Sequence, residues 1–376
     1  METSPQIKEK SRPGPRGAPG QPLRIFVKGL NWVGDAIMAT PALSQLRHAY
    51  PKAKITMMVR PWVAAVYEHS PDIDVLWVHD DAASPVAFLK AVRLVRTGHF
   101  QLGLALPNSF RAAALLWLGQ VRYRIGYRRS QRGWLLSDAV AVRPEYLKEH
   151  QIYYYLHLIE GRCGKLAQRP RQVLRSGELE REEVRRLLAQ RGLDRGLPLV
   201  GIAPGSINSS AKRWPTERFA ALADRIAEEG KAEILLLGSG KELDVLERVA
   251  AACKAPVHNL GGAIDLGQLI ALIERLAGLV CNDSGAMHMG AAIGIPTVAL
   301  FGPTEYETTY PFSRTARIVR KAVTCAPCML RECPTDHHCM LEIGIDEAFE
   351  GFKSVIKESR KTGVLTTTIE FSTKTR

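Results

Sequence analysis

Hydrophobic residues along the chain occur in two alternating patterns: short uninterrupted runs, and longer segments in which they recur at helical spacing. The short runs have strand length and lack the polar–apolar alternation of a half-exposed strand, so they predict parallel strands that are buried on both faces. In the first part of the chain these runs are residues 23–29, 54–59, 74–79 and 102–107. The segments of helical spacing between them are residues 34–50, 61–70 and 84–98. A βαβα series of this type predicts an open parallel sheet with helices on both of its sides.

A strongly charged segment, residues 175–196, interrupts the series, after which the two patterns resume. The later strand-length runs are residues 198–205, 232–238, 257–262, 278–283 and 297–302. Residues 214–230 predict a helix, with Pro215 in its first turn and Gly230 as its stop signal. The sequence therefore predicts an α/β protein of two βαβ domains, hinged near residues 170–195. Ligands of such sheets bind at the carboxyl ends of the strands, here in the cleft between the domains.

We expect four regions along the 376 residues. They are a disordered basic tail at residues 1–22, an N-terminal domain at 23–175, a C-terminal domain at 176–350, and the end of a C-terminal helix with a tail at 351–376. The first region is polar, rich in Pro and Gly, and lacks the hydrophobic core of a signal peptide. The longest hydrophobic runs, such as residues 112–119, are too short to cross a bilayer. These features predict a cytoplasmic protein.

The chain has a formal net charge of +13 and a pI near 9.5, which indicates an anionic partner. Nucleic acid, an acidic membrane surface and a phosphorylated ligand all fit this charge. The sequence contains no recognisable nucleic-acid module, and its basic residues are not interleaved with stacking aromatic residues, so we expect no nucleic acid partner. The basic surface is compatible with peripheral contact with an anionic membrane.

The first candidate site lies in GLNWVGDAIMATPALSQLR, residues 29–47, where a predicted strand leads through a loop into a helix. Asp35 stands at this junction, at the carboxyl edge of the first sheet. Two interpretations are open and are compatible with each other. Asp35 can be a first-turn carboxylate that the helix dipole and free backbone N–H groups favour. It can also be a general base, beside a glycine that leaves room for a substrate hydroxyl.

The second candidate is APGSINSSAKRWP, residues 203–215. A strand ends in Pro-Gly, and Ser209, Ser210 and Lys212 precede the start of a helix. Backbone N–H groups, serine hydroxyls and a lysine in this position make a phosphate-binding site, although the spacing is not that of a Walker loop. A polar loop with solvated cations is the alternative.

The third candidate is CNDSGAMHMGAAIGIPTVALFGPT, residues 281–304. A strand ends near Asp283, and Ser284 and Gly285 open a short helix that carries His288. A carboxylate at a strand end and a helix N-terminus can together hold a ribose and a phosphate. The alternative is an ordinary helix cap beside a partly buried histidine.

In sequence and order, these three segments resemble the motifs of the ADP-heptose:lipopolysaccharide heptosyltransferases of glycosyltransferase family 9. A fourth segment, residues 106–138, resembles the acceptor domain of the type II members of that family. The resemblance implies a GT-B fold, in which two Rossmann-like domains with parallel sheets face an interdomain cleft. It also implies an inverting transfer of L-glycero-D-manno-heptose from ADP-heptose to the heptosyl-Kdo-lipid A inner core, as the second heptose. The reaction would need no metal and no cofactor.

The resemblance further implies roles for single residues. Asp35 matches the catalytic base of the family, and Lys212 matches the lysine that contacts the donor phosphates. All the positions that match donor-binding motifs are Ser209, Ser210, Lys212, Asp283, Ser284, Gly285 and His288. The N-terminal domain would bind the lipid A acceptor and the C-terminal domain the nucleotide sugar. Some family members also have an acidic residue after the strand predicted at 232–238, a role that here could fall to Glu242 or to the backbone.

An arginine-rich sequence, RYRIGYRRSQRGW, falls in the acceptor half of the chain. Both the donor and the lipid A core carry anionic groups, which suits a basic protein. We expect Arg124, Arg128, Arg129 and Arg132 to contact phosphates or carboxylates of the acceptor. A solvated charged loop would have the same composition. With a lipid A–Kdo–heptose acceptor, the protein would contact the inner face of the inner membrane peripherally.

Four of the seven cysteines lie within residues 325–339, with the spacing C-x2-C-x4-C-x5-C. Cys325, Cys328, Cys333 and Cys339 could close a structural zinc site or hold an iron–sulfur cluster. Reduced, buried or redox-paired cysteines are the alternative. The family resemblance assigns these residues no catalytic role.

Three other functions stay open from the sequence. A family 9 transferase of type I or type III would have the same donor motifs and a different acceptor. A GT-B-like sugar-nucleotide epimerase would need its own set of acidic and histidine residues, which the sequence does not display. A non-catalytic RNA- or membrane-binding protein would account for the charge alone.

Overall fold

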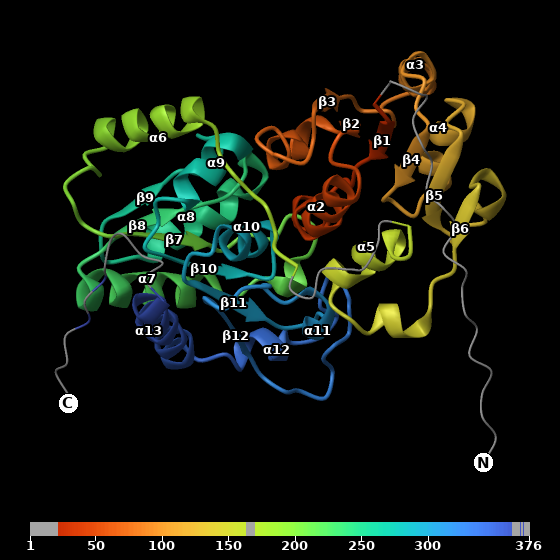
Figure 1. Ribbon diagram of the computed structural model, residues 1–376. Helices are drawn as coiled ribbons and strands as arrows, with labels where there is room; N and C mark the ends of the chain where they lie inside the picture. The colour runs from red at the N-terminus through yellow and green to blue at the C-terminus, as the bar shows by residue number, and fades with distance from the viewer. Residues whose placement is uncertain (1–21, 163–169, 363–368, 370, 372–376) are drawn as a thin grey trace. The chain divides into compact units, whose positions relative to one another are not determined.

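The computed structural model describes residues 22–162, 170–362, 369 and 371. They form two compact units, which are described separately (Figure 1). The first unit consists of the described residues within 1–31, 39–64 and 71–171. The second unit consists of those within 32–38, 65–70 and 172–376. Most of the two predicted tails lies outside the described residues, namely residues 1–21, 363–368, 370 and 372–376.

The first unit contains a parallel sheet of six strands in the order β3-β2-β1-β4-β5-β6. This is the strand order of a Rossmann sheet. The strands are β1 (Arg24–Lys28), β2 (Lys54–Val59), β3 (Val75–Val78), β4 (Leu102–Ala105), β5 (Tyr123–Tyr127) and β6 (Asp138–Val140). The helices are α2 (Thr40–Ala49), α3 (Pro85–Thr97), α4 (Phe110–Leu118) and α5 (Gln151–Ile159), with short 3-10 helices η2 (Gly133–Leu135) and η3 (Pro144–Leu147).

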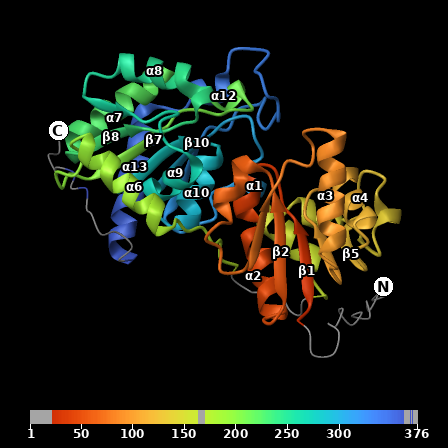
Figure 2. The same cartoon turned by 90° about the horizontal axis from the view of Figure 1, so that it is seen from above.

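Buried hydrophobic side chains pack α3 and α4 onto one face of this sheet. Phe26 of β1, Val95 of α3 and Leu115 of α4 belong to one core cluster. The rings of Phe26 and Phe100 lie 5.2 Å apart between their centroids within it. Helices α2 and α5 contact each other on the opposite side of the sheet (Figures 1 and 2). The uninterrupted hydrophobic character of the strands follows from this coverage of both faces.

The second unit contains another parallel six-stranded sheet, in the order β12-β11-β10-β7-β8-β9. Counted from β7 as its first strand, this sheet has the same Rossmann order as the first. Its strands are β7 (Leu199–Ala203), β8 (Glu233–Leu236), β9 (Val257–Asn259), β10 (Gly278–Asn282), β11 (Thr297–Phe301) and β12 (Ala316–Arg320). Its helices are α1 (Val33–Met38), α6 (Glu178–Gln190), α7 (Thr216–Gly230), α8 (Leu243–Ala252), α9 (Leu266–Ile273), α10 (Gly285–Ile293), α11 (Tyr306–Thr309), α12 (His338–Leu341) and α13 (Ile345–Thr362), with 3-10 helices η4 (Ser210–Lys212) and η5 (Gly240–Glu242). The predicted α/β class with two Rossmann-like domains is thus confirmed.

Helices α7, α8 and α13 cover one face of the second sheet, while α9 and α10 lie on the other (Figure 1). The stripe of hydrophobic residues on α7, which includes Phe219 and Ile226, is fully buried in the core cluster of this unit. Phe352 and Ile356 of α13 belong to the same cluster. Because these two residues lie beyond position 350, the predicted C-terminal region supplies part of the core.

Several predicted helices differ from the observed ones. Residues 34–50 form two helices, α1 and α2, which are separated at Ala39. The break precedes Pro41, whose ring has no N–H to donate and clashes with the carbonyl four residues earlier. The segment predicted as a helix at 61–70 contains a 3-10 helix, η1 (Pro61–Val66).

Helix α7 also differs from its predicted ends. It includes Gly230, the predicted stop, and Lys231 takes the left-handed conformation that follows, with a φ of 47°. Pro215 is the residue just before the first turn. The helix therefore starts and stops one residue later than its two sequence signals indicate.

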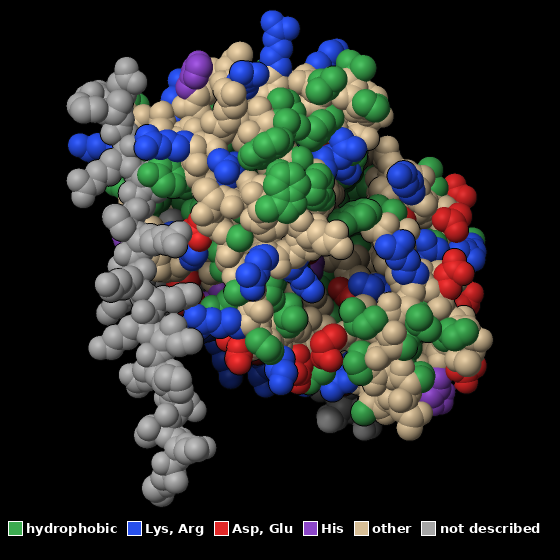
Figure 3. Space-filling model, turned by 90° about the vertical axis from the view of Figure 1, so that its right-hand side faces the viewer, with side chains coloured by type: hydrophobic (Ala, Val, Ile, Leu, Met, Phe, Trp, Pro, Cys, Tyr) green, Lys and Arg blue, Asp and Glu red, His purple; other side chains and the backbone are tan. Residues whose placement is uncertain are grey.

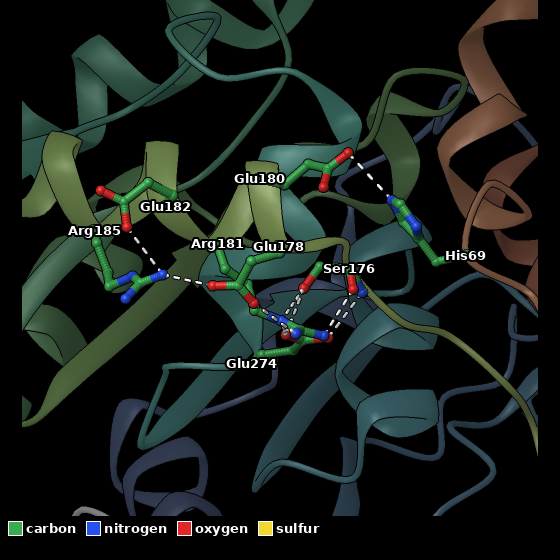
Figure 4. Close-up of polar contacts among 8 residues, drawn as sticks. All are labelled: His69, Ser176, Glu178, Glu180, Arg181, Glu182, Arg185 and Glu274. Atoms are coloured by element: carbon green, nitrogen blue, oxygen red, sulfur yellow. Dashed lines mark hydrogen bonds and ion pairs between the residues drawn. The ribbon is translucent and has the colours of Figure 1, made fainter.

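The charged segment before β7 contains α6, a helix that the sequence interpretation did not predict. Figure 4 shows the contacts that hold its first turn against the rest of the second unit. Ser176 donates hydrogen bonds from its backbone N–H and its hydroxyl to the carboxylate of Glu274, at 3.0 and 2.6 Å. Nε2 of His69 lies 3.3 Å from Oε1 of Glu180. Glu274 caps α9, so the start of α6 is fixed against that helix.

Candidate functional site

The strand order reverses in the second unit between β7 and β10, which are neighbours in the sheet. In open α/β sheets, loops at the carboxyl ends of the strands on either side of such a reversal form the ligand-binding crevice. Residues 204–215 follow β7 and residues 283–285 follow β10. Two of the three candidate segments therefore meet at the position where a Rossmann sheet binds its ligand.

Asn282, the last residue of β10, fixes the loop after β7. Its side chain is fully buried. Nδ2 donates a hydrogen bond to the carbonyl of Pro204 at 2.7 Å, and Oδ1 accepts one from the backbone N–H of Trp214 at 3.1 Å. One amide group thereby holds both ends of the loop that carries Lys212. Sequence analysis did not select Asn282, although a polar residue at the end of a buried strand was a usable signal.

We expect the substitution Asn282→Ala to lower the free energy of unfolding by about 2–4 kcal/mol, because it leaves a buried carbonyl and a buried N–H without their partner. Urea denaturation followed by circular dichroism measures this loss. Asn282→Asp is the informative comparison: it retains the acceptor for Trp214, replaces the donor to Pro204 by a carboxylate oxygen, and should also be destabilising because it buries a charge against a carbonyl. Unchanged stability in Asn282→Ala would contradict the proposed role of this side chain in holding the loop.

Lys212 and Asp283 form an ion pair across the reversal point. Nζ of Lys212 lies 2.7 Å from Oδ2 of Asp283, and the hydroxyl of Thr304 donates to the same oxygen at 2.7 Å. Asp283 is buried, whereas about a quarter of the Lys212 side chain is exposed (26%). The carboxylate therefore orients a cation that still reaches the surface. Thr304 belongs to the third candidate segment but is not among the residues expected at the site.

Asp35 lies in the first turn of α1 and is half-buried. Burial raises the pKa of its carboxyl group from 3.8 to about 6, and the positive charge of Lys212 opposes this rise. The neighbouring hydroxyl of Tyr67 donates to the carbonyl of Ala36 at 3.0 Å. A carboxylate with a pKa close to 6 is ionised at neutral pH and more basic than an ordinary aspartate, which suits a general base.

Gly34 brings the first candidate segment against the third. A Cβ at this position would lie 2.7 Å from Cδ2 of His288, closer than real Cβ atoms approach another heavy atom. His288 is buried on α10, and α1 packs along that helix. Gly285 also faces α1, since a Cβ there would lie 3.5 Å from Val33. The glycine before Asp35 is thus required for the close contact between α1 and α10.

Ser284 is the N-cap residue of α10, directly after Asp283. Its backbone is extended, and the first N–H groups of the helix follow it. These N–H groups carry the positive end of the helix dipole and can hold a phosphate. The structure therefore gathers Asp35, Lys212, Asp283, Ser284 and His288 around one sheet edge within the second unit.

The hydroxyl groups of Ser209 and Ser210 are directed toward protein atoms. Ser209 Oγ donates to the carbonyl of Arg331 at 3.0 Å, and Ser210 Oγ lies 3.4 Å from the same oxygen. The backbone N–H of Ala211 also donates to it, at 3.1 Å. The serine pair thus anchors the Lys212 loop to the cysteine-containing segment. A direct contact of either hydroxyl with a phosphate would require the loss of these hydrogen bonds.

Glu242 is buried at the same sheet edge. Its carboxylate accepts hydrogen bonds from the N–H and the hydroxyl of Ser239, both at 2.9 Å, as a capping box. A Cβ on Gly205 would lie 2.0 Å from Oε1 of Glu242, so any larger residue at position 205 would displace that carboxylate. Glu242 therefore reaches the crevice from β8, where the sequence left its role open.

The four arginines expected to contact the acceptor do not share one environment. Arg132 is fully buried, and its guanidinium donates to the carbonyls of Tyr127, Pro107 and Ser109. Burial lowers the pKa of Arg132 to about 10. This position differs from the expected contact with acceptor anions, because the guanidinium has no exposed surface and its donors are occupied.

Arg124 is half-buried and also bonds to the backbone, with Nε donating to Leu135 O and Nη1 to Val121 O, both at 2.7 Å. Arg124 and Arg132 thus hold the fold of the arginine-rich stretch itself. Arg128 and Arg129 are exposed. They are the two members of the predicted set that are available to an anionic ligand.

The cysteine-containing segment, residues 325–339, follows β12 and ends within α12. Its four thiols are free: Cys325, Cys328, Cys333 and Cys339. Cys339 is buried, and burial together with the other three nearby thiols raises its pKa to about 11. Among the described residues, the group whose potential metal-ligand atoms all lie within 4.8 Å of one another is Glu68, His69 and Glu180. The described part of the chain also contains no helix that is long and apolar enough to cross a membrane.

Comparisons with known proteins show the family of the chain. The model of glycosyltransferase family 9 (heptosyltransferase) matches residues 88–338. The lipooligosaccharide heptosyltransferase 2 of Haemophilus ducreyi is 31% identical over 315 residues, which cover 79% of this chain and 88% of that protein. The lipopolysaccharide heptosyltransferase 2 of Escherichia coli is 30% identical over 307 residues, with the same two coverages.

Solved structures show the same similarity. The structure of the E. coli ADP-heptose lps heptosyltransferase II has a TM-score of 0.77 and 26% identity, and the match covers 90% of this chain and 100% of that one. A glycosyl transferase family 9 protein of Veillonella parvula has a TM-score of 0.80 and 24% identity, with 90% and 98% covered. The second similarity supports the fold alone.

Proposed function

Because the chain belongs to glycosyltransferase family 9, the heptosyltransferase family, we propose that it is a type II enzyme of lipopolysaccharide core synthesis. In this proposal it transfers L-glycero-D-manno-heptose from ADP-heptose to heptosyl-Kdo-lipid A as the second heptose. One observation carries the assignment of the site. Asp35, Lys212, Asp283 and His288 come from three separate sequence motifs and lie around the carboxyl ends of β7 and β10.

In the proposed reaction, Asp35 accepts the proton of an acceptor heptose hydroxyl. The hydroxyl oxygen attacks the anomeric carbon of the donor, and the bond from that carbon to the β-phosphate oxygen breaks. ADP leaves with the electron pair of that bond, on the side opposite the attack, so the configuration inverts. The raised pKa of Asp35 makes it a stronger base than an exposed aspartate while it stays ionised at neutral pH.

Lys212 stabilises the negative charge that grows on the pyrophosphate as ADP leaves. Its ion pair with Asp283 holds the ammonium group at the edge of the sheet, and the N-terminus of α10 supplies further N–H donors. Asp283, Ser284, Gly285 and His288 are assigned to the ADP part. Since no step uses a Lewis acid, the proposed transfer is independent of metal.

The acceptor is assigned to the predicted N-terminal domain, residues 23–175, and the donor to the predicted C-terminal domain, residues 176–350. Arg128 and Arg129 are the exposed arginines of the first unit that we assign to anionic groups of the lipid A–Kdo–heptose acceptor. Ser209 and Ser210 support the phosphate loop through Arg331. The proposal places the reaction in the cytoplasm, at the inner face of the inner membrane.

The test is an assay of the purified full-length chain with ADP-heptose and defined acceptors, with products identified by mass spectrometry. We expect one heptose to be added to monoheptosyl-Kdo-lipid A at an unchanged rate in the presence of a chelator. Kdo-lipid A without heptose and a diheptosylated acceptor identify type I and type III activity, and ADP-heptose alone reveals an epimerase. No transfer to the monoheptosyl acceptor would reject the type II assignment.

A further inference from the structure

Residues 82–137 of the first unit contain no Asp or Glu. The whole chain of 376 residues has 38 acidic residues, so a gap of this length concentrates positive charge locally. The cations within it are Lys90, Arg93, Arg96, Arg111, Arg122, Arg124, Arg128, Arg129 and Arg132. All except Arg124 and Arg132 are exposed. The charged side chains that this stretch itself contributes to the surface are therefore all positive, and they would attract an anionic partner over a Debye length.

Hydrophobic side chains are exposed within the same region. On α3, Val86 and Leu89 are 61% and 63% exposed and lie three residues apart, so they share one side of the helix. Lys90 and Arg93 continue that side. The opposite side of α3, with Val95, is buried in the core. Helix α3 thus has a hydrophobic side toward the sheet and a second, mixed hydrophobic and basic side toward the surface.

Three exposed aromatic side chains form a cluster beside α3. Trp134 of η2 is 67% exposed, and its ring centroid lies 6.1 Å from that of Phe110 and 5.9 Å from that of Trp117, both on α4. Phe110 and Trp117 are themselves nearly half exposed. Large aromatic groups that pack on one another at the surface, rather than in a core, are typical of an interaction site.

Arg111 joins the aromatic cluster to α3. Its guanidinium lies 4.9 Å from the ring centroid of Phe88, which packs against the core from α3. Helices α3 and α4 are in contact along this side of the unit. Figure 3 shows hydrophobic side chains gathered on this face with Lys and Arg side chains among them. We name the exposed residues Val86, Leu89, Lys90, Arg93, Phe110, Trp117 and Trp134 the basic aromatic face.

We propose that the basic aromatic face binds the surface of an anionic phospholipid bilayer. Tryptophan and phenylalanine insert at the level of the lipid headgroups, and arginine and lysine bind the headgroup phosphates above it. Each cation near such a surface adds about 1 kcal/mol, or about a fivefold gain in partitioning. The proposal deepens the proposed function, because a lipid A acceptor lies in a membrane, and it rests on that function only for its biological purpose.

A lipid surface fits this face better than a protein partner does. The side chains are spread over two helices and a 3-10 turn and include long flexible cations, with no acidic residue among residues 82–137 to pair with a partner's cations. A bilayer needs no shape complementarity and accepts such a mixture of aromatic and basic groups. Charge complementarity therefore selects an anionic membrane as the occupant.

The experiment is flotation of the full-length chain with vesicles of phosphatidylcholine and phosphatidylglycerol, or of phosphatidylcholine alone. We expect the chain to float with the anionic vesicles, to float less in high salt, and to remain largely unbound with neutral ones. Brominated acyl chains in the anionic vesicles should quench tryptophan emission. Failure of the wild-type chain to float with anionic vesicles would overturn the proposal, and binding of the face to a protein would then be the remaining explanation.

Two independent variants locate the contact. Lys90→Glu with Arg93→Glu should weaken partitioning by about tenfold or more, on the basis of the loss and reversal of two charges. Trp117→Ser with Trp134→Ser should abolish most of the quenching by brominated lipid. Leu179→Ser with Arg186→Glu, an exposed leucine and an exposed arginine on α6, is the matched control and should bind as the wild type does. The assignment of this face would be rejected if the wild type, both variants of the face and the α6 control bound the vesicles equally. It would also be rejected if the control lost as much binding as the two variants of the face.

Transfer activity separates the two proposals. With a water-soluble acceptor that lacks acyl chains, the Lys90→Glu/Arg93→Glu variant should transfer heptose at the wild-type rate, whereas with acceptor embedded in anionic vesicles it should be slower. An inactive wild-type chain that still floats would reject the proposed function and leave the membrane face in place. An active chain that never floats would reject the membrane face and leave the proposed function in place.

Discussion

Replacement of Asp35 by asparagine is expected to lower kcat by about 10²–10⁴-fold, the usual contribution of a general base. Asparagine has the size of aspartate and cannot accept the proton of the acceptor hydroxyl. The affinity for ADP should not fall, because Lys212 and Asp283 are untouched and the substitution removes a negative charge near Lys212. Steady-state kinetics with isothermal titration of ADP separates the two effects. Asp244→Asn, which alters a first-turn aspartate of α8 in the same unit, is the matched control and should remain fully active.

The pH profile of the wild-type enzyme gives a second test of Asp35. Its pKa is raised to about 6, so the fraction of ionised base, and with it kcat, should fall as the pH drops through about 6. The stability of the folded protein changes with pH in the direction opposite to kcat. A carboxyl group whose pKa is higher in the folded state loses stability as the pH rises from 3.8 through about 6, because the buried charge is unfavourable.

Asp35→Asn removes that unfavourable charge. The variant should therefore be more stable than the wild type at pH 8, by roughly 1–3 kcal/mol, and about equally stable at pH 4. Thermal unfolding at the two pH values measures the difference. A variant that is inactive and also less stable at pH 8 would indicate a structural role for Asp35 at the start of α1 instead of a role as base.

The second large effect is expected for Lys212→Met, with kcat lower by about 10²–10³-fold, since the growing charge on the leaving pyrophosphate loses its cation. The same substitution leaves the buried carboxylate of Asp283 with Thr304 as its remaining described side-chain partner. It also removes the charge that lowers the pKa of Asp35. The acid limb of the pH profile should therefore move to higher pH, which a loss of packing alone would not cause.

Lys254→Met, an exposed lysine of the second unit, is the control and should show neither effect. Lys212→Arg retains the charge and should restore part of the activity and the position of the acid limb, although its planar group fits the site differently. An unchanged acid limb in Lys212→Met would mean that Lys212 and Asp35 do not interact in the working enzyme, and the proposed pairing of base and cation would fail.

The central strands of both sheets were predictable from the sequence because they are buried on both faces and therefore form uninterrupted hydrophobic runs. Three strands were missed, β5, β6 and β12, because they lie at or next to a sheet edge and are only partly buried, so they form no such run. Asp35, Lys212 and Asp283 could be placed at the ends of the predicted strands, since parallel strands end at a common edge. The break before Pro41 was also accessible in principle. The sequence interpretation treated the segment as one helix because its hydrophobic spacing continues across the proline.

Other residues could not be placed without the fold. Arg132 is charged and was expected to contact acceptor anions, yet its guanidinium is buried against the carbonyls of Pro107 and Ser109, which lie in a loop 25 and 23 residues earlier in the chain. In the sequence, Asn282 is one more residue of a strand. Its hydrogen-bond partners, Pro204 and Trp214, lie 78 and 68 residues earlier in the chain. Exposure of Trp117 and Trp134 is equally invisible in the sequence, because a hydrophobic residue is normally assigned to a core.

The division of the chain has a consequence for the evolution of this enzyme. The polypeptide passes from one compact unit to the other after residues 31, 38, 64, 70 and 171, so the second unit is completed by α1, an element that lies between two segments of the first unit in the sequence. A chimera of two family members joined at residue 171 would take Asp35 from one parent and His288, against which Gly34 packs, from the other. Exchange of halves therefore also exchanges the neighbours of Asp35, the proposed base, and separates α1 from the α10 against which it packs.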